Sequence, residues 1–384
     1  MSEFTQRMVS PEKIHLINFS RKLTVSTIFF LAPLYFLKIG FNGWQIGIVI
    51  SLYAFAPLLF SYPTGWINDR FSMRRVIQSA LLSLSLLFLL VSEARNFFLM
   101  AFLFLLLGMA NNALDVSLNS LYFKDERDMD LNRKYGQLTF WMSLGPAVGT
   151  LFGGILTYFT SFKILFYAFS FFILAVLFLV RNFGQEKFAL VSLREYRKNL
   201  FRKKTIFFSI LIFFLTLHWG VEGTVYTPFL KTFFHFNNFQ LSLYISPPLF
   251  FLAFSAFLIS LLRYNARINK RIFLISMLLS GIGLLLMVNR SVFLSFLFRI
   301  VHEIGDGAMG ALNVLFISRL FEKRSIGGSS GILVAIMTLG NMVGALLFSP
   351  LGYKAGLQYP FLLAGLLLVA NAGFGYFIFG REEY

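Results

Sequence analysis

Four ionisable side chains lie close together in a stretch of the chain whose flanks are apolar. At 100° per residue of α-helix, Arg299, His302, Glu303 and Asp306 share an arc of about 100°, and Asn313 continues the same face. A charged side chain at the centre of a bilayer costs at least ~2.5–3.5 kcal/mol, so such residues usually face a cavity and act there. Carboxylates beside histidine and arginine can bind a cationic group or relay protons. The spacing therefore predicts one helix that carries a polar stripe roughly 20 Å long.

Two other apolar segments carry ionisable residues in their interiors, whereas we expect none in the remaining nine. In one of them, His218 and Glu222 stand one helical turn apart and so share a face. The other carries a polar face made of Asn111, Asn112, Asp115 and Asn119. These side chains either line a cavity together with the stripe or join helices through hydrogen bonds, with Glu222 satisfying His218. The cost of placing carboxylates in hydrocarbon favours the cavity.

The elements that position these residues must cross a membrane. Of 384 residues, 57% are hydrophobic and only 13% are charged, which is too little charge to cover a soluble protein of this size. Twelve apolar segments are long enough to span a bilayer, at about 23–40, 44–66, 74–92, 97–123, 135–160, 163–181, 205–231, 239–262, 271–289, 291–319, 326–353 and 357–380. The composition therefore predicts an all-α polytopic membrane protein with twelve transmembrane helices in contact with lipid.

Lysine and arginine are distributed unevenly between the two sides of the predicted membrane. The termini and the connections on their side hold 27 Lys and Arg, the opposite connections hold six, and Arg299 is the remaining one of 34. By the positive-inside rule we expect both termini in the cytoplasm and the protein in the cytoplasmic (inner or plasma) membrane. The net charge of +17 then faces anionic lipid, which excludes nucleic acid as a partner.

The two halves of the chain are internal repeats. A shift of 195 residues places identical residues on one another, among them Pro33 on Pro228, Asn42 on Asn237, Gln45 on Gln240, Gly145 on Gly340 and Gly149 on Gly344. We expect six-helix bundles at 1–181 and 205–384, repeated in the same orientation, as in transporters with parallel repeats. The basic stretch 182–204 joins them, either as an amphipathic helix on the inner membrane surface or as a solvated linker.

The connection after the second segment carries a family signature. Gly65, Asp69, Arg70 and Arg74 match Gly-x-x-x-Asp-Arg-x-Gly-Arg-Arg/Lys, with Ser72 in place of the second glycine. With its twelve segments, the chain resembles the major facilitator superfamily over essentially its full length. The resemblance implies that Asp69 and the arginines latch the cytoplasmic ends of the two halves. A carboxylate can indeed cap a helix amino terminus and pair with arginine at the membrane surface.

Two shorter resemblances leave the direction of transport open. Gly145, Pro146 and Gly149 are similar to the core of the antiporter motif of drug exporters in this superfamily, although small residues also simply permit close helix packing. The start of the polar stripe resembles the basic-x-x-His-x-x-acid relay of lactose-permease-type proton symporters. Gly305 stands where that relay has its acid.

These features predict a proton-coupled secondary transporter that carries a small organic solute by alternating access, as a monomer. Two alternatives stay open: efflux of hydrophobic or cationic compounds by antiport, and a transporter-like lipid translocase or sensor. We find no nucleophile–base–orienter set and no nucleotide-binding motif, so we expect neither enzymatic activity nor a cofactor. The chain has no Cys, and His302 with Glu303 or Asp306 lacks a recognised ligand spacing, so we expect no metal site.

Overall fold

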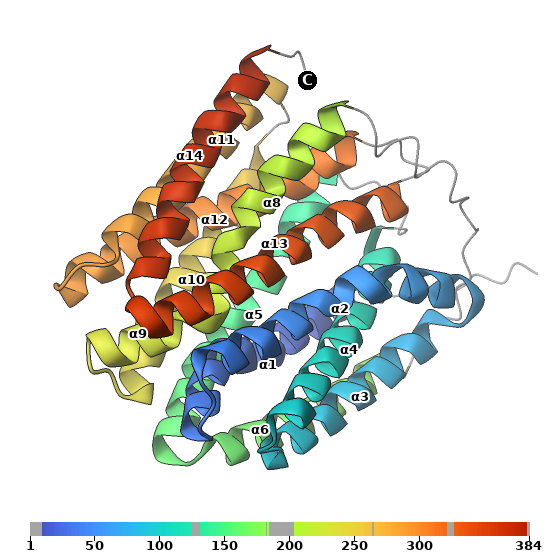
Figure 1. Ribbon diagram of the computed structural model, residues 1–384. Coiled ribbons are helices and arrows are strands. Elements are labelled where there is room, and N and C mark those ends of the chain that lie inside the picture. Colours follow the sequence, from blue (N-terminus) through green and yellow to red (C-terminus); the bar gives the residue numbers. More distant parts are fainter. Residues whose placement is uncertain are drawn as a thin grey trace, which may run out of the picture.

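The computed structural model describes residues 10–123, 131–181, 183, 203–262, 265–320 and 326–381. Every regular element in these ranges is a helix (Figure 1). The helices are α1 (Pro11–Lys38), α2 (Gly43–Arg70), α3 (Met73–Glu93), α4 (Phe97–Phe123), α5 (Leu131–Phe159), α6 (Phe162–Val180), α8 (Lys203–Thr224), α9 (Tyr226–Phe233), α10 (Asn238–Leu261), α11 (Ala266–Leu286), α12 (Val292–Leu320), α13 (Ile326–Ala355) and α14 (Tyr359–Arg381). The predicted all-α class is confirmed. The predicted linker 182–204 lies almost entirely outside the described residues.

The helices follow the twelve predicted segments, with two notable differences. α1 begins at Pro11 rather than near residue 23. The seventh segment is divided into α8 and α9 at Val225. Pro228 contributes to the division, because proline lacks the N–H that would bond to the carbonyl of Thr224 and its ring crowds that carbonyl. The hydroxyl of Tyr353 donates to the Thr224 carbonyl instead, at 3.3 Å.

Ten of the described helices are long and apolar enough to cross a membrane. α1 and α12 are not among these ten, and each carries an arginine that is at most 1% exposed, Arg21 and Arg299. The outward faces of the bundle are strongly apolar, as Phe98 at 77% exposure and Phe178 at 79% illustrate. Exposed phenylalanines on this scale suit a hydrocarbon environment.

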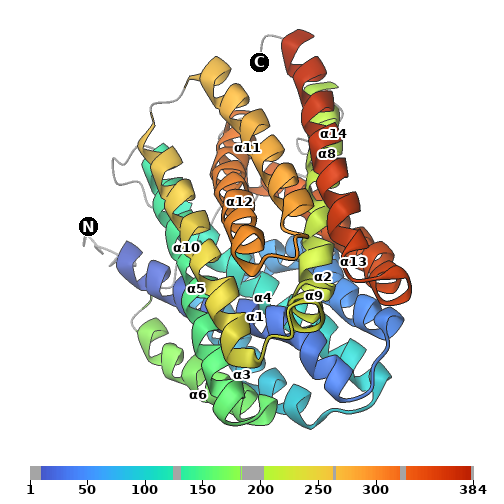
Figure 2. The ribbon, with the colours of Figure 1, turned by 90° about the vertical axis from the view of Figure 1, so that its left-hand side faces the viewer.

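The first half, α1 to α6, lies against the second half, α8 to α14 (Figures 1 and 2). The start of α2 and the equivalent start of α10 carry the same capping box, in which an asparagine side chain and a glutamine side chain bond to each other's backbone N–H. The residues are Asn42 with Gln45 and Asn237 with Gln240. The repeat seen in the sequence therefore extends to the local geometry of these helix starts.

Equivalent glycines also bring equivalent helices together. A Cβ at Gly149 of α5 would lie 2.2 Å from the carbonyl oxygen of Leu23 in α1. A Cβ at Gly344 of α13 would lie 2.0 Å from the carbonyl oxygen of Leu217 in α8. Only glycine permits backbones to approach this closely. The fifth helix of each half is thus pressed onto the first helix of the same half.

The seam between the halves consists mainly of α5 against α10 and α2 against α13, and α1 also contacts α9 there (Figure 2). Side chains donate to backbone carbonyls across it: Ser51 to Met342 (3.1 Å), Thr227 to Phe30 (2.8 Å), Asn238 to Thr157 (3.3 Å), Ser246 to Ala147 (2.7 Å) and Ser349 to Gly43 (2.6 Å). We call the face that carries the connections 39–42, 234–237 and 356–358 the distal face. It lies opposite the described chain ends, and there Gly43 abuts Tyr353 across the seam.

Candidate functional site

The second half holds a buried arginine between two carboxylates. The Arg299 guanidinium pairs with Glu222 of α8 and with Glu303, which stands one turn further along α12. Its Cζ atom lies 4.2 Å from the centre of the Tyr226 ring, which adds a cation–π contact. Arg299 and Glu303 are 1% and 2% exposed. Such burial is tolerated because each charge faces an opposite charge.

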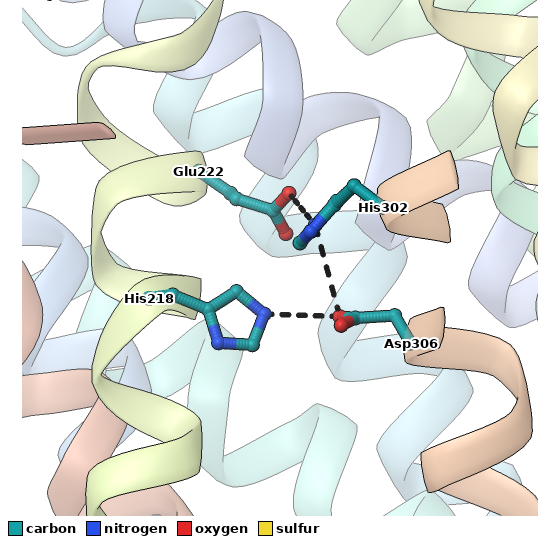
Figure 3. A group of neighbouring side chains, drawn as sticks. All are labelled: His218, Glu222, His302 and Asp306. Carbon is teal, nitrogen blue, oxygen red and sulfur yellow. Dashed lines mark hydrogen bonds and ion pairs between the residues drawn. The ribbon is translucent and has the colours of Figure 1, made fainter. Parts of the chain in front are cut away.

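Figure 3 shows two histidine–carboxylate pairs, one of which includes Glu222, the partner of the arginine. His218 Nε2 lies 3.0 Å from Asp306 Oδ2, and His302 Nε2 lies 3.1 Å from Glu222 Oε1. His302 Nε2 is also 4.0 Å from Asp306 Oδ2, which joins the two pairs. The two imidazole rings meet edge to face with their centroids 5.4 Å apart. α8 and α12 each contribute one histidine and one carboxylate, so the pairs tie these helices together.

Ser280 of α11 forms hydrogen bonds with both α12 residues of this cluster. Its Oγ donates to Asp306 Oδ1 at 2.7 Å, and His302 Nδ1 donates to its carbonyl oxygen at 3.0 Å. α11 reaches the cluster because it packs closely on α12: a Cβ at Gly305 would lie 2.4 Å from the carbonyl oxygen of Ser276. The glycine that replaces the acid of the symporter-type relay is therefore required by helix packing.

The first half holds its own buried ion pair, between α1 and α4. Arg21 Nη2 lies 2.6 Å from Asp115 Oδ1, and the guanidinium also donates to Asn111 Oδ1 at 2.8 Å and to Asn18 Oδ1 at 3.1 Å. The Arg21 side chain is fully buried, whereas 34% of the Asp115 side chain is exposed. A carboxylate this exposed in the middle of a helix borders open space.

Arg21 is not among the interior residues predicted from the sequence. The expectation that the other nine segments lack interior ionisable residues is therefore wrong. The first apolar segment, predicted at about 23–40, starts after Arg21, which assigns the arginine to a cytoplasmic tail. The signal was present: Pro11 is well suited to the first turn of a helix, and Asn18, Arg21 and Val25 follow at helical spacing. The interior therefore holds two buried arginines, Arg21 and Arg299.

The asparagines of α4 differ in their surroundings. Asn111 bonds to Arg21, whereas the Oδ1 of Asn112 accepts from the Ser61 hydroxyl of α2 at 3.0 Å. Asn112 Nδ2 and Asn119 Oδ1 are buried and make no hydrogen bond within the described residues. On α12, Asn313 Nδ2 lies 3.5 Å from the sulfur of Met337. Asn111 and Asn112 therefore join helices, while the Oδ1 of Asn119 has no such partner in the described part of the chain.

The two halves carry their charges in opposite order. α1 and α8 are equivalent in the repeat, as are α4 and α12. The first half has its arginine on α1 and its acid on α4, through Arg21 and Asp115. The second half has its acid on α8 and its arginine on α12, through Glu222 and Arg299. One turn beyond Asp306, a Cβ at Gly310 would meet no atom within 4 Å, so the polar stripe of α12 borders open space.

A family model described as Major Facilitator Superfamily matches residues 14–265 and 208–384. The chain belongs to the Major Facilitator Superfamily. Solved structures share the fold: a mutant of the nucleoside transporter NupG is 15% identical, with 96% of this chain and 99% of that chain covered and a TM-score of 0.76. A bacterial homolog of the human lysosomal transporter Spinster, inward-facing and occupied, is 14% identical, with 95% of each chain covered and a TM-score of 0.75.

The human organic anion transporter MFSD10 is also 14% identical, with 95% of this chain and 100% of that chain covered and a TM-score of 0.70. No curated protein matches this sequence. The fold of this superfamily member is thus the twelve-helix transporter fold, with α8 and α9 together forming its seventh helix. Structural similarity at identities this low establishes the fold but does not identify the transported solute.

The loop signature of this superfamily member lies partly inside a helix. Gly65, Asp69 and Arg70 occupy the last two turns of α2, which continues to Arg70 rather than ending near residue 66. Their side chains lie outside the described part of the structure. Arg74 is half-buried in the first turn of α3. The latch implied by the resemblance stays a prediction.

The glycines of the antiporter-like motif contact α1. A Cβ at Gly145 would lie 2.7 Å from the carbonyl oxygen of Phe19, one turn from the close approach at Gly149. Pro146 lies between them within α5. Helix packing alone accounts for these small residues, so they carry no argument for drug efflux.

Proposed function

We propose that this member of the superfamily is a proton-coupled secondary transporter that carries a small organic solute by alternating access. Asp115 is the observation that carries the proposal. It is a carboxylate with a third of its side chain exposed in the interior of α4, held by the fully buried Arg21. A charged group is costly at this depth, and its partial exposure makes it available to a solute.

Asp115 supports both parts of the proposal. A solute with a cationic or hydrogen-bond-donating group can bind to its exposed oxygen. A proton that reaches the same oxygen removes its charge and weakens its hold on Arg21. In this proposal the polar face of α4 supplies further hydrogen bonds, chiefly through the unpartnered amide atoms of Asn112 and Asn119 within the described residues.

The second half supplies the opposite wall in this proposal. Glu222, Glu303 and Asp306 are solute and proton groups of this wall, and Arg299 and His302 tune them. Gly310 supports this arrangement because the space next to it lies on the same face of α12 as the stripe.

We also propose that both termini are cytoplasmic and that the described state opens toward the cytoplasm. The excess of Lys and Arg on the terminal side supports the orientation. The seam contacts near the distal face, such as Ser349 to the Gly43 carbonyl, support a closed outer side. We propose that Asp69, Arg70 and Arg74 latch the inner side when the carrier reverses, and that a monomer is the working unit.

The first experiment is a thermal-stabilisation screen of the purified full chain at two pH values. The library contains nucleosides and organic anions, because the structurally similar NupG and MFSD10 are transporters of these classes, and lipophilic cations, which test the efflux alternative. Solutes that stabilise the protein then go to proteoliposomes, where uptake is measured with and without a proton gradient.

We expect a proton gradient to drive accumulation in the parent protein, and Asp115→Asn to abolish this accumulation while exchange of solute without a gradient persists. The matched control is Glu93→Gln, because Glu93 pairs with Lys163 at the distal face, away from both halves' interior charges. Accumulation that survives in Asp115→Asn contradicts the proposed role of this residue. Proton coupling is contradicted if a stabilising solute is taken up to the same extent with and without a proton gradient.

A further inference from the structure

The cluster of α8 and α12 contains four potential metal-ligand atoms that converge on one point (Figure 3). His218, Glu222, His302 and Asp306 each offer one such atom, and these atoms all lie within 4.8 Å of one another. Metal–ligand bonds of 2.0–2.2 Å in a tetrahedron require ligand atoms roughly 3.3–3.6 Å apart. Three of the separations are 3.0, 3.1 and 4.0 Å. Two ligand atoms as far apart as 4.8 Å must approach each other by roughly 1.4 Å, a shift that side-chain rotation can supply.

Both histidines are oriented as metal ligands are. His302 Nδ1 is bonded to the carbonyl oxygen of Ser280, and His218 Nδ1 to the carbonyl oxygen of Leu215. A carbonyl only accepts, so Nδ1 carries the hydrogen in each ring, and in the neutral imidazole Nε2 is left with a lone pair that points into the cluster. A hydrogen bond from Nδ1 to a backbone carbonyl is the usual support of a metal-bound histidine.

Each Nε2 lone pair faces a carboxylate oxygen, which is also an acceptor. His218 Nε2 and Asp306 Oδ2 are 3.0 Å apart, and His302 Nε2 and Glu222 Oε1 are 3.1 Å apart. These contacts are satisfied either by a proton on each Nε2, which makes an imidazolium that donates to its carboxylate, or by a cation that the four atoms share. One ion at the point where the four atoms converge satisfies both contacts at once.

The surrounding charge fits an ion of charge +2. Three carboxylates and one guanidinium lie in the network, so with neutral imidazoles and ionised carboxylates it lacks two positive charges. Arg299 is matched by Glu303, which is not among the four converging groups. The negative charges of Glu222 and Asp306 are thus left for the ion to neutralise.

We propose that His218, Glu222, His302 and Asp306 bind one divalent transition-metal ion of the Zn²⁺ class, which joins α8 to α12. Two imidazoles and two carboxylates suit Zn²⁺ and its neighbours, whereas Mg²⁺ and Ca²⁺ prefer sites made of oxygen alone. The site departs from the expectation of no metal site. The spacing within each helix could not reveal it, because its ligands come from two helices that are far apart in the sequence.

The test is a binding experiment and needs no knowledge of the transported solute. The full chain is purified in detergent with any polyhistidine tag removed, and Zn²⁺ binding is measured by calorimetry. The chain has no Cys and only four His, so background sites are few. Co²⁺ then serves as the spectroscopic probe, because tetrahedral Co²⁺ absorbs visible light strongly. We expect about one Zn²⁺ and one Co²⁺ per chain, a tetrahedral Co²⁺ spectrum, and no displacement by Mg²⁺.

Three variants locate the ion. Asp306→Asn removes a ligand and is expected to weaken Zn²⁺ binding by more than about 100-fold, beyond the range of residues that only orient ligands. Ser280→Ala keeps all four ligands and is expected to weaken binding by about 10–100-fold. His235→Asn is the matched control: His235 lies between α9 and α10 with a φ of 56°, a conformation that asparagine tolerates, and its loss is expected to leave binding unchanged.

Size-exclusion profiles establish that each variant is folded before binding is compared. The proposal is overturned if the parent protein shows no tetrahedral Co²⁺ spectrum, or if Asp306→Asn and Ser280→Ala both bind Zn²⁺ as the parent does. It is also overturned if His235→Asn abolishes binding. Because the readout is binding, a negative result here leaves proton-coupled solute transport unaffected, and a failure of solute transport leaves the metal site intact.

Discussion

Replacing Asp115 with asparagine is expected to destabilise the protein more than replacing Arg21 with glutamine, although both changes break the same ion pair. Asp115→Asn leaves the guanidinium of Arg21 fully buried without a counter-charge. Removing one partner of a buried pair costs about 3–5 kcal/mol, and the remaining amide contacts from Asn111 and Asn18 place this case near about 3 kcal/mol. Arg21→Gln leaves a carboxylate that is 34% exposed, so water solvates it and the cost is about 1–2 kcal/mol.

The double variant carries neither charge and is expected to lose less stability than Asp115→Asn alone, with a coupling energy of at least about 1 kcal/mol. Unfolding is followed in mixed micelles by tryptophan fluorescence as denaturant is added, with all four proteins in the same detergent. Equal losses in the two single variants, a greater loss in Arg21→Gln, or additive losses in the double variant would refute the reasoning.

Three further predictions test packing and surface contacts. Gly305→Ala is expected to destabilise the protein by about 1–3 kcal/mol through its collision with α11, whereas Gly310→Ala on the same helix meets open space and is expected to be neutral or slightly stabilising in the same unfolding assay. Tyr353→Phe removes the hydrogen bond at the end of α8 and is expected to cost about 1 kcal/mol in that assay. Glu93→Gln breaks a half-exposed pair with Lys163, at 2.7 Å, and is expected to lower stability only slightly, an effect that added salt should erase. A large, salt-independent loss in Glu93→Gln, or equal losses at the two glycines, would contradict these arguments.

Much of the fold was predictable because lipid imposes a strong rule on sequence. Every backbone polar group within hydrocarbon must be bonded internally, so long apolar segments become helices. The polar stripe was predictable for the same reason: helical periodicity places Arg299, Glu303 and Asp306 on one face, and the structure places all three in one network.

The partners of these residues were harder to predict. Ser280 is one serine among many in apolar segments, and nothing in its spacing marks it as the residue that contacts both His302 and Asp306. Arg21 was missed because a charge near a segment end looks like a loop residue until helix length is known. The division at Val225 follows from Pro228, yet the equivalent Pro33 lies inside the unbroken α1. Proline alone therefore does not decide whether a helix breaks, because neighbouring contacts such as that of Tyr353 also contribute.

The seam has a consequence for the energetics of any movement between the halves. The ion pairs described here, including Arg21–Asp115 and Arg299–Glu222, each lie within a single half. The five seam hydrogen bonds run from uncharged side chains to carbonyls, and each such bond contributes only about 0.5–1.5 kcal/mol net. A rotation of one half against the other therefore separates none of these opposite charges, and the seam hydrogen bonds that it breaks are individually weak and neutral.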